Sequence, residues 1–223
     1  MRLKRVCIYG AGAIGGWLGV ALARAGCELS AVARGQTLAA LQHGGLTLVH
    51  GEERETVAVN AQQDPAAVGV QDLVVIAVKA PSMPDVARAV APLIGPQTLV
   101  LTAMNGVPWW FLAGGVDASL RGLQLRTVDP QGEIARAIPT EQVLGSVVHA
   151  SCSLDAPGVV RDLRGHHRDG RRQQNLPGRP LRLRRHRGLL RLVRVAHVLH
   201  PHRGAGAHGG DPAREEAVDR HPR

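Results

Sequence analysis

The stretch Arg5-Val6-Cys7-Ile8-Tyr9-Gly10-Ala11-Gly12-Ala13-Ile14-Gly15 decides the fold of this chain. The four apolar residues after Arg5 predict a short strand that ends at the first glycine. Apolar residues then recur at helical spacing over residues 13–25, and Gly26 predicts the end of that helix. Residues 27–33 form a second apolar run and a second predicted strand. The pattern Gly-x-Gly-x-x-Gly therefore lies inside one β-α-β unit, the context in which it binds a dinucleotide.

The three glycines of this pattern meet three different requirements. Gly10 permits the tight turn, Gly12 carries no side chain that would block a pyrophosphate, and Gly15 lets the helix pack closely on the strand. Free N–H groups at the start of the helix face the phosphates. A glycine-rich turn without a ligand is the alternative. We predict that six consecutive residues hold the pyrophosphate: Gly10, Ala11, Gly12, Ala13, Ile14 and Gly15.

The residue after the second strand indicates which dinucleotide binds. An NAD site usually has an acidic residue there, which holds the ribose 2′-hydroxyl. In this chain the strand is followed by Arg34, and the nearest acid, Glu28, is at the opposite end of the strand. An arginine suits a 2′-phosphate because its planar guanidinium can donate two charge-assisted hydrogen bonds. The sequence predicts NADP(H), with an ordinary surface arginine as the alternative.

The remainder of the first 160 residues predicts an α/β fold with a doubly wound, mainly parallel sheet. Continuous apolar runs are typical of parallel strands that are covered on both faces. The predicted elements are a hairpin of strands 46–50 and 55–59, strands 73–78, 98–102 and 143–150, and a helix over 82–93 capped by Ser82.

Two polar residues directly follow buried strands of this sheet. Lys79 comes after the run 73–78, and Asn105 comes shortly after the run 98–102. Ligands of such sheets lie beyond the carboxyl ends of the strands, so both residues are candidates for the active site. The alternatives are a solvated strand-end lysine and an ordinary Asn-Gly turn.

Taken together, these motifs resemble the ketopantoate reductase family, and the resemblance covers residues 4–160. Members open with Gly-x-Gly-x-x-Gly and carry a lysine at the end of an apolar strand and an Asn-Gly after the next strand. The matching segments are Ala77-Val78-Lys79-Ala80, Asn105-Gly106-Val107, His149-Ala150-Ser151 and Pro157-Gly158-Val159-Val160.

The resemblance implies a Rossmann-type NADP-binding domain over residues 1–160 and NADPH-dependent reduction of a 2-oxo acid to a 2-hydroxy acid. The expected substrate is 2-dehydropantoate, which is reduced to pantoate in pantothenate synthesis. By resemblance, Lys79 lies near the nicotinamide ribose, Asn105 contacts the cofactor and the substrate oxygen, and Ser151 lies near the nicotinamide. The family's general acid is a lysine of a helical second domain. Because no lysine follows Lys79, we expect this chain to be weakly active or inactive.

The composition changes near residue 160. Residues 161–223 contain 16 of the 25 arginines and 8 of the 11 histidines, but no Ser, Thr, Ile or Lys. Their net charge is +10, whereas residues 1–160 carry 11 basic and 12 acidic side chains. A frameshift in a GC-rich gene explains this composition, and a genuine arginine-rich tail that binds nucleic acids is the alternative. Under the first explanation, the segment would bind nucleic acids only non-specifically. We expect disorder, apart from one amphipathic helix near residues 189–196.

The sequence argues against several other classes of protein. Cys7, Cys27 and Cys152 are far apart and form no CxxC pair, so we predict neither disulfides nor a metal site, and a cytoplasmic location. No apolar run reaches the roughly 18–20 residues of a membrane span. The partner predicted for the first 160 residues is a small-molecule 2-oxo acid. The competing function is a non-catalytic dinucleotide-binding protein with a basic tail.

Overall fold

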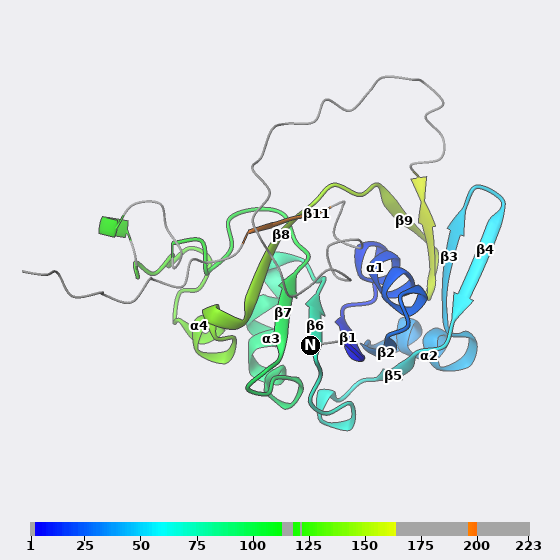
Figure 1. Cartoon of the computed structure of the whole chain (residues 1–223), viewed down its shortest axis with the longest axis horizontal. Helices are drawn as coiled ribbons and strands as arrows, with labels where there is room; N and C mark the ends of the chain where they lie inside the picture. Colours follow the sequence, from blue (N-terminus) through cyan, green and yellow to red (C-terminus); the bar gives the residue numbers. More distant parts are fainter. Residues whose placement is uncertain (1–2, 113–117, 121, 164–195, 200–223) are drawn as a thin grey trace, which may run out of the picture.

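The computed structural model describes residues 3–112, 118–120, 122–163 and 196–199. Its α-helices and strands alternate over residues 5–50, and further strands follow before the next α-helix (Figure 1). In chain order they are β1 (Arg5–Tyr9), α1 (Ala13–Arg24), β2 (Glu28–Val32), α2 (Gly35–Gly44), β3 (Leu46–His50), β4 (Glu53–Val57), β5 (Asn60–Gln62), β6 (Leu73–Ile76), α3 (Met83–Ala89), β7 (Leu99–Thr102), α4 (Glu133–Ala137), β8 (Val143–Val148), β9 (Cys152–Ala156), β10 (Val159–Asp162) and β11 (Ala196–Leu199).

The larger of two sheets has the strand order β11-β8-β7-β6-β1-β2-β5. All neighbours from β8 to β5 are parallel, and only β11 pairs antiparallel, with β8. The chain begins at the central strand β1, moves outward to β5 and returns to the other side through β6, β7 and β8. This order confirms the predicted doubly wound Rossmann-type α/β fold.

Alternation along the central strands explains why the sheet is covered on both faces. Val6 and Ile8 of β1 belong to the apolar core that includes α1, whereas Cys7 and Tyr9 belong to the core that includes α3. Successive side chains of a strand point to opposite faces, so a continuous apolar run fits a strand between two layers. The predicted strands of the β-α-β unit are confirmed.

The smaller sheet, with the order β4-β3-β10-β9, is a feature that the sequence patterns did not reveal. Helix α1 lies between the two sheets and contacts β1 and β2 on one side and β3 and β10 on the other (Figure 1). A Cβ atom on Gly16 would lie 2.6 Å from Cγ2 of Val160, and one on Gly19 would lie 3.0 Å from Cδ2 of Leu46. These two glycines therefore let the second sheet approach the helix.

Several predicted elements have different bounds in the structure, among them the hairpin and the helix that follows β6. In the hairpin, His50 pairs with Glu53 across a two-residue turn, so β4 begins two residues earlier than predicted. Gly51 has a φ of +60°, which suits such a tight turn. The predicted helix 82–93 ends at Ala89, and Ala91–Leu93 form a 3₁₀ turn. Pro92 explains the break, because its ring clashes with the carbonyl four residues earlier in an α-helix.

The predicted cap of helix α3 is also wrong. Ser82 makes no side-chain capping hydrogen bond, and its backbone is already helical, with a φ of −88° and a ψ of −3°. An N-cap residue needs an extended backbone to place its oxygen over the first N–H groups. Ser82 instead ends the 3₁₀ turn Ala80–Ser82.

The basic segment contributes one short strand to the larger sheet. Strand β11 pairs with β8, from Ala196 opposite Val148 to Leu199 opposite Gly145. Ala196 is thus the first residue of a strand instead of the end of a helix, and the remainder of the predicted helix lies outside the described residues. The edge of β8 offers unpaired N–H and C=O groups, which an extended segment can satisfy.

Candidate functional site

The glycine loop between β1 and α1 has the geometry that a pyrophosphate needs. Gly10 has a φ of +95°, a conformation that favours glycine. A Cβ atom on Gly12 would meet nothing within 4 Å, so the space beside this residue is open. The first helical hydrogen bond runs from the Gly16 N–H to the Gly12 carbonyl, at 2.7 Å. The preceding N–H groups of α1 are therefore available to an anion in the open space.

Gly15 has a packing role. A Cβ atom at this position would lie 2.1 Å from the Gly10 carbonyl oxygen and 2.9 Å from Cγ2 of Ile8. We expect Gly15→Ala to lower the free energy of unfolding by about 1–3 kcal/mol, because backbone would have to move to admit the methyl group. Urea unfolding followed by circular dichroism measures this change.

Gly44→Ala provides the matched control for this substitution. Gly44 is also a helical glycine, but a Cβ atom there would meet nothing within 4 Å. We expect the control to unfold at or slightly above the original midpoint, because alanine favours the helix. Equal stability of the Gly15→Ala protein and the original chain would contradict the close packing of the loop on α1.

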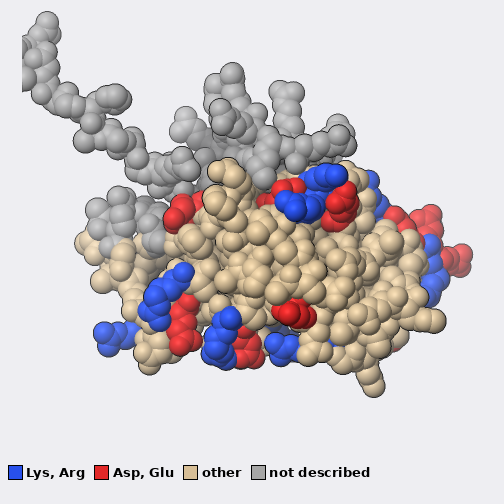
Figure 2. Space-filling model, turned by 90° about the horizontal axis from the view of Figure 1, so that it is seen from below, with Lys and Arg blue, Asp and Glu red and all other residues tan. Residues whose placement is uncertain are grey.

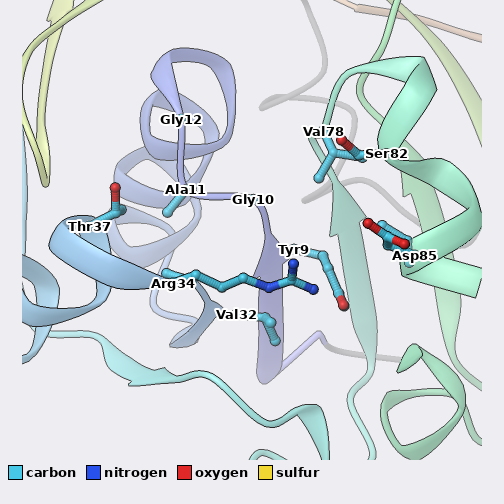
Figure 3. A pocket seen from close by; sticks show the side chains of 12 residues that line it. Tyr9, Gly10, Ala11, Gly12, Val32, Arg34, Thr37, Val78, Ser82 and Asp85 are labelled. Atoms are coloured by element: carbon cyan, nitrogen blue, oxygen red, sulfur yellow. The ribbon is translucent and has the colours of Figure 1, made fainter. Parts of the chain in front are cut away.

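A cavity of about 300 Å³ lies beside the glycine loop and contains the predicted arginine (Figure 3). Arg34 precedes the first residue of α2 and extends its guanidinium across this cavity. The carboxyl end of β2 and the N-terminal part of α3 form the opposing walls. The lining residues are Tyr9, Gly10, Ala11, Gly12, Val32, Ala33, Arg34, Thr37, Val78, Ser82, Asp85 and Val86.

Helix α2, which the sequence patterns did not predict, adds two features to this cavity. The N–H groups of its first residues precede the first helical hydrogen bond, which Leu38 donates to the Arg34 carbonyl at 3.3 Å. Thr37 brings a hydroxyl group to the wall. A positively charged side chain, free N–H groups and a hydroxyl together favour an anion such as a phosphate.

Tyr9 and Asp85 are further residues of the cavity that sequence reasoning missed. The Tyr9 side chain is buried, and burial raises the pKa of its hydroxyl above the ordinary value. The positive charge of the Arg34 guanidinium opposes this shift. Asp85 lies on the α3 side of the cavity and forms an ion pair with Arg88, one turn further along the helix.

The other predicted site residues lie outside this cavity. Lys79 is exposed beyond the carboxyl end of β6, and its carbonyl accepts a hydrogen bond of 2.9 Å from the Ser82 N–H. Ser151 is exposed between β8 and β9, and its carbonyl accepts a hydrogen bond of 2.9 Å from the Leu163 N–H. Both residues are at loops beyond the ends of strands, but neither lines the cavity of Arg34.

Asn105 connects the loop after β7 to the end of β8. Its Nδ2 donates to the Val148 carbonyl at 3.1 Å, and its Oδ1 accepts from the Val148 N–H at 2.9 Å. The residue also lines a second cavity, of about 410 Å³, whose walls are mostly apolar and include Met83 and Trp109. The structure thus brings the glycine loop and Arg34 together and leaves Asn105 at a neighbouring site.

The described part of the chain contains neither a helix suited to crossing a membrane nor a cluster of metal ligands. No helix there has the length and apolar character that crossing a membrane requires. Within the same residues, no cluster of three or more His, Cys, Asp or Glu side chains could hold a metal ion.

The chain is similar to proteins of a known family. Residues 6–113 match the sequence model of the family described as ketopantoate reductase PanE/ApbA. This part of the chain is therefore similar to the ketopantoate reductase family. A 2-dehydropantoate 2-reductase from Mesorhizobium japonicum is 44% identical over 162 residues, which are 72% of this chain and 49% of that protein.

Solved structures of ketopantoate reductases agree with the match. A protein of Ralstonia solanacearum MolK2 that is assigned to the ketopantoate reductases is 52% identical, with a TM-score of 0.68 over 72% of this chain and 50% of that one. A family member from Ralstonia eutropha JMP134 is 32% identical, with a TM-score of 0.56 over 72% of this chain and 46% of that one. The chain therefore spans about half the length of these ketopantoate reductases.

Proposed function

We propose that this chain binds NADPH at the carboxyl edge of the larger sheet. The observation that carries the proposal is that the glycine loop and Arg34 line one cavity. The open space at Gly12 and the N-terminus of α1 suit the pyrophosphate, and the cavity between β2 and α3 suits the adenosine. Arg34, together with Thr37 and the N-terminus of α2, suits the 2′-phosphate.

The reaction that we propose is the reduction of a 2-oxo acid to a 2-hydroxy acid, with 2-dehydropantoate as the substrate and pantoate as the product. The Mesorhizobium japonicum relative, a 2-dehydropantoate 2-reductase, supports this substrate. Bound NADPH would supply the hydride that the carbonyl carbon receives. The carbonyl oxygen gains negative charge in this step, so it needs a hydrogen-bond donor and then a proton.

Asn105 can supply the hydrogen bond even though its amide is already engaged. A carboxamide has two N–H donors and two acceptor lone pairs, and Val148 occupies one of each. The second N–H remains for the substrate oxygen. The pair of bonds with Val148 fixes the direction of this donor, which favours a group that acts in the transition state.

Two further assignments are part of the proposal. Lys79 would lie near the nicotinamide ribose, and the backbone of Ser151 would lie near the nicotinamide. Their places beyond the ends of β6 and β8 support these roles, because cofactors of this fold cross the carboxyl ends of the strands. We also propose a cytoplasmic location, which the wide spacing of Cys7, Cys27 and Cys152 in the sequence supports.

Calorimetric titration with NADPH and NADH tests the proposed cofactor. We expect NADPH to bind more tightly, because only NADPH carries the 2′-phosphate that Arg34 suits. Equal affinities for the two cofactors would contradict the assignment of Arg34. No binding of either cofactor by folded protein would contradict the proposed site as a whole.

The basic residues 161–223 give a further prediction, which concerns the alternative function. We propose that these residues are not a native domain and that they bind polyanions through charge alone. On the face shown in Figure 2, acidic and basic side chains of the described residues are interspersed, without a patch of one sign. We therefore expect equal affinities for duplex DNA, single-stranded DNA and heparin in filter-binding titrations, with a steep decrease as salt rises. A clear preference for one nucleic acid would support the alternative.

A further inference from the structure

The position of the Arg34 guanidinium is notable because arginine side chains at the surface are usually mobile. Arg34 is exposed, yet its guanidinium extends into the cavity and lies beside the Tyr9 side chain (Figure 3). The register of the strands explains the contact. Tyr9 is paired with Val32 in adjacent parallel strands, and Arg34 follows Val32 by two residues. Residues two apart in extended chain point to the same face, so the two side chains meet.

The Tyr9 side chain is a rigid partner for this contact. It is only 6% exposed and packs in the apolar core that includes Val32, Ile76 and Val86. Strand β1 is hydrogen-bonded to β2 on one side and to β6 on the other, so its backbone is fixed as well. A buried ring with a polar tip therefore presents its hydroxyl at one place in the cavity wall.

The neutral character of this partner matters for an anionic ligand. Within the part of the chain that the structure describes, no carboxylate lies within 4.0 Å of the Arg34 guanidinium. Asp85, which also lines the cavity, is paired with Arg88. A carboxylate partner would neutralise the guanidinium and compete with a phosphate, whereas a hydroxyl orients it and leaves its positive charge uncompensated.

We propose that Tyr9 is a positioning residue of the cofactor site, which holds the Arg34 guanidinium where the 2′-phosphate binds and thereby strengthens the preference for NADPH over NADH. The inference rests on the proposed NADPH site. An arginine that is already oriented loses less rotamer entropy when the phosphate arrives, so binding becomes tighter without a direct contact from Tyr9.

Two small ligands test this role on the full 223-residue chain. Adenosine 2′,5′-bisphosphate carries the 2′-phosphate, and 5′-AMP lacks it. We expect Tyr9→Phe to lower the affinity for the bisphosphate by about 3- to 10-fold and to leave the affinity for 5′-AMP unchanged, as measured by calorimetry. The substitution removes one oxygen and keeps the buried ring, and thermal unfolding checks that the fold is intact.

A double-mutant cycle shows whether Tyr9 acts through Arg34. In the Arg34→Ala protein, we expect Tyr9→Phe to cause no further loss of affinity for the bisphosphate. If Tyr9→Phe lowers the affinities for both ligands equally, or if its effect persists in the Arg34→Ala protein, the positioning role is wrong. If Arg34→Ala selectively lowers the affinity for the bisphosphate but Tyr9→Phe does not, only the role of Tyr9 is wrong. If Arg34→Ala has no selective effect, the proposed phosphate site and the inference are both wrong.

Discussion

The 223-residue chain is expected to bind NADPH but to oxidise it with 2-dehydropantoate at least about 10²-fold more slowly than a full-length relative. In the proposed site, the glycine loop and Arg34 would hold the cofactor and Asn105 would contact the substrate oxygen. By resemblance to the family, however, the proton donor is a lysine, and this sequence contains none after Lys79. The decrease in absorbance at 340 nm measures the turnover rate, and calorimetry measures binding in the same preparation.

A fusion protein shows whether slow turnover is caused by a missing proton donor or by a damaged nucleotide site. Strand β10 continues to Asp162 and pairs with β3, so the second half of a relative should be joined after Asp162. We expect this fusion to recover turnover, and we expect Asn105→Ala in the fusion to lower it again. Rapid reduction of 2-dehydropantoate by the 223-residue chain itself would contradict the prediction and would mean that another group supplies the proton.

Replacement of Arg34 by alanine should weaken NADPH binding by about 10- to 150-fold, or about 1.5–3 kcal/mol. The expected loss is this large because the arginine would donate charge-assisted hydrogen bonds to the 2′-phosphate. The affinity for NADH should be nearly unchanged, since NADH has a hydroxyl group at that position. Fluorescence titration of both cofactors measures the two dissociation constants.

Arg54→Ala is the matched control for the loss of one positive charge. Arg54 is exposed on β4, in the smaller sheet, and is not among the residues that line the cavity of Arg34. We expect this control to leave both affinities unchanged at moderate ionic strength, because exposed charges beyond a Debye length are largely screened. A similar loss of NADPH affinity in both variants would indicate general electrostatic attraction in place of a specific contact.

The part of the fold that the sequence predicted well is the part that local patterns encode. The strand ending at Tyr9, the helix beginning at Ala13 and the arginine after β2 are neighbours along the chain, and their order alone predicts a nucleotide site. Strand β10 shows the opposite case. Its residues are few, and its partner β3 lies more than a hundred residues earlier, so no local periodicity reveals the pairing.

In the candidate site, too, some residues are indicated by local sequence patterns and others depend on how the strands pair. The positions of Gly10, Gly12 and Arg34 around one cavity were predictable, because a tight turn and an open space favour glycine and Arg34 directly follows the second strand. Their proposed roles in binding a cofactor stay predictions. Tyr9 was not predictable, because a tyrosine at the end of an apolar strand looks like an ordinary core residue. Its contact with Arg34 depends on the parallel register of β1 and β2, which the sequence does not show.

The placement of α1 between the two sheets has a consequence for how a dinucleotide would arrive. A helix covered on one side only can tilt or shift when a ligand meets its N-terminus, whereas α1 contacts β1 and β2 on one side and β3 and β10 on the other. The N–H groups that would face a pyrophosphate in the proposed site are thus held in place by the fold itself. Dinucleotide binding at the N-terminus of α1 would then need no rearrangement of the helix. Its association rate would be set by diffusion and orientation.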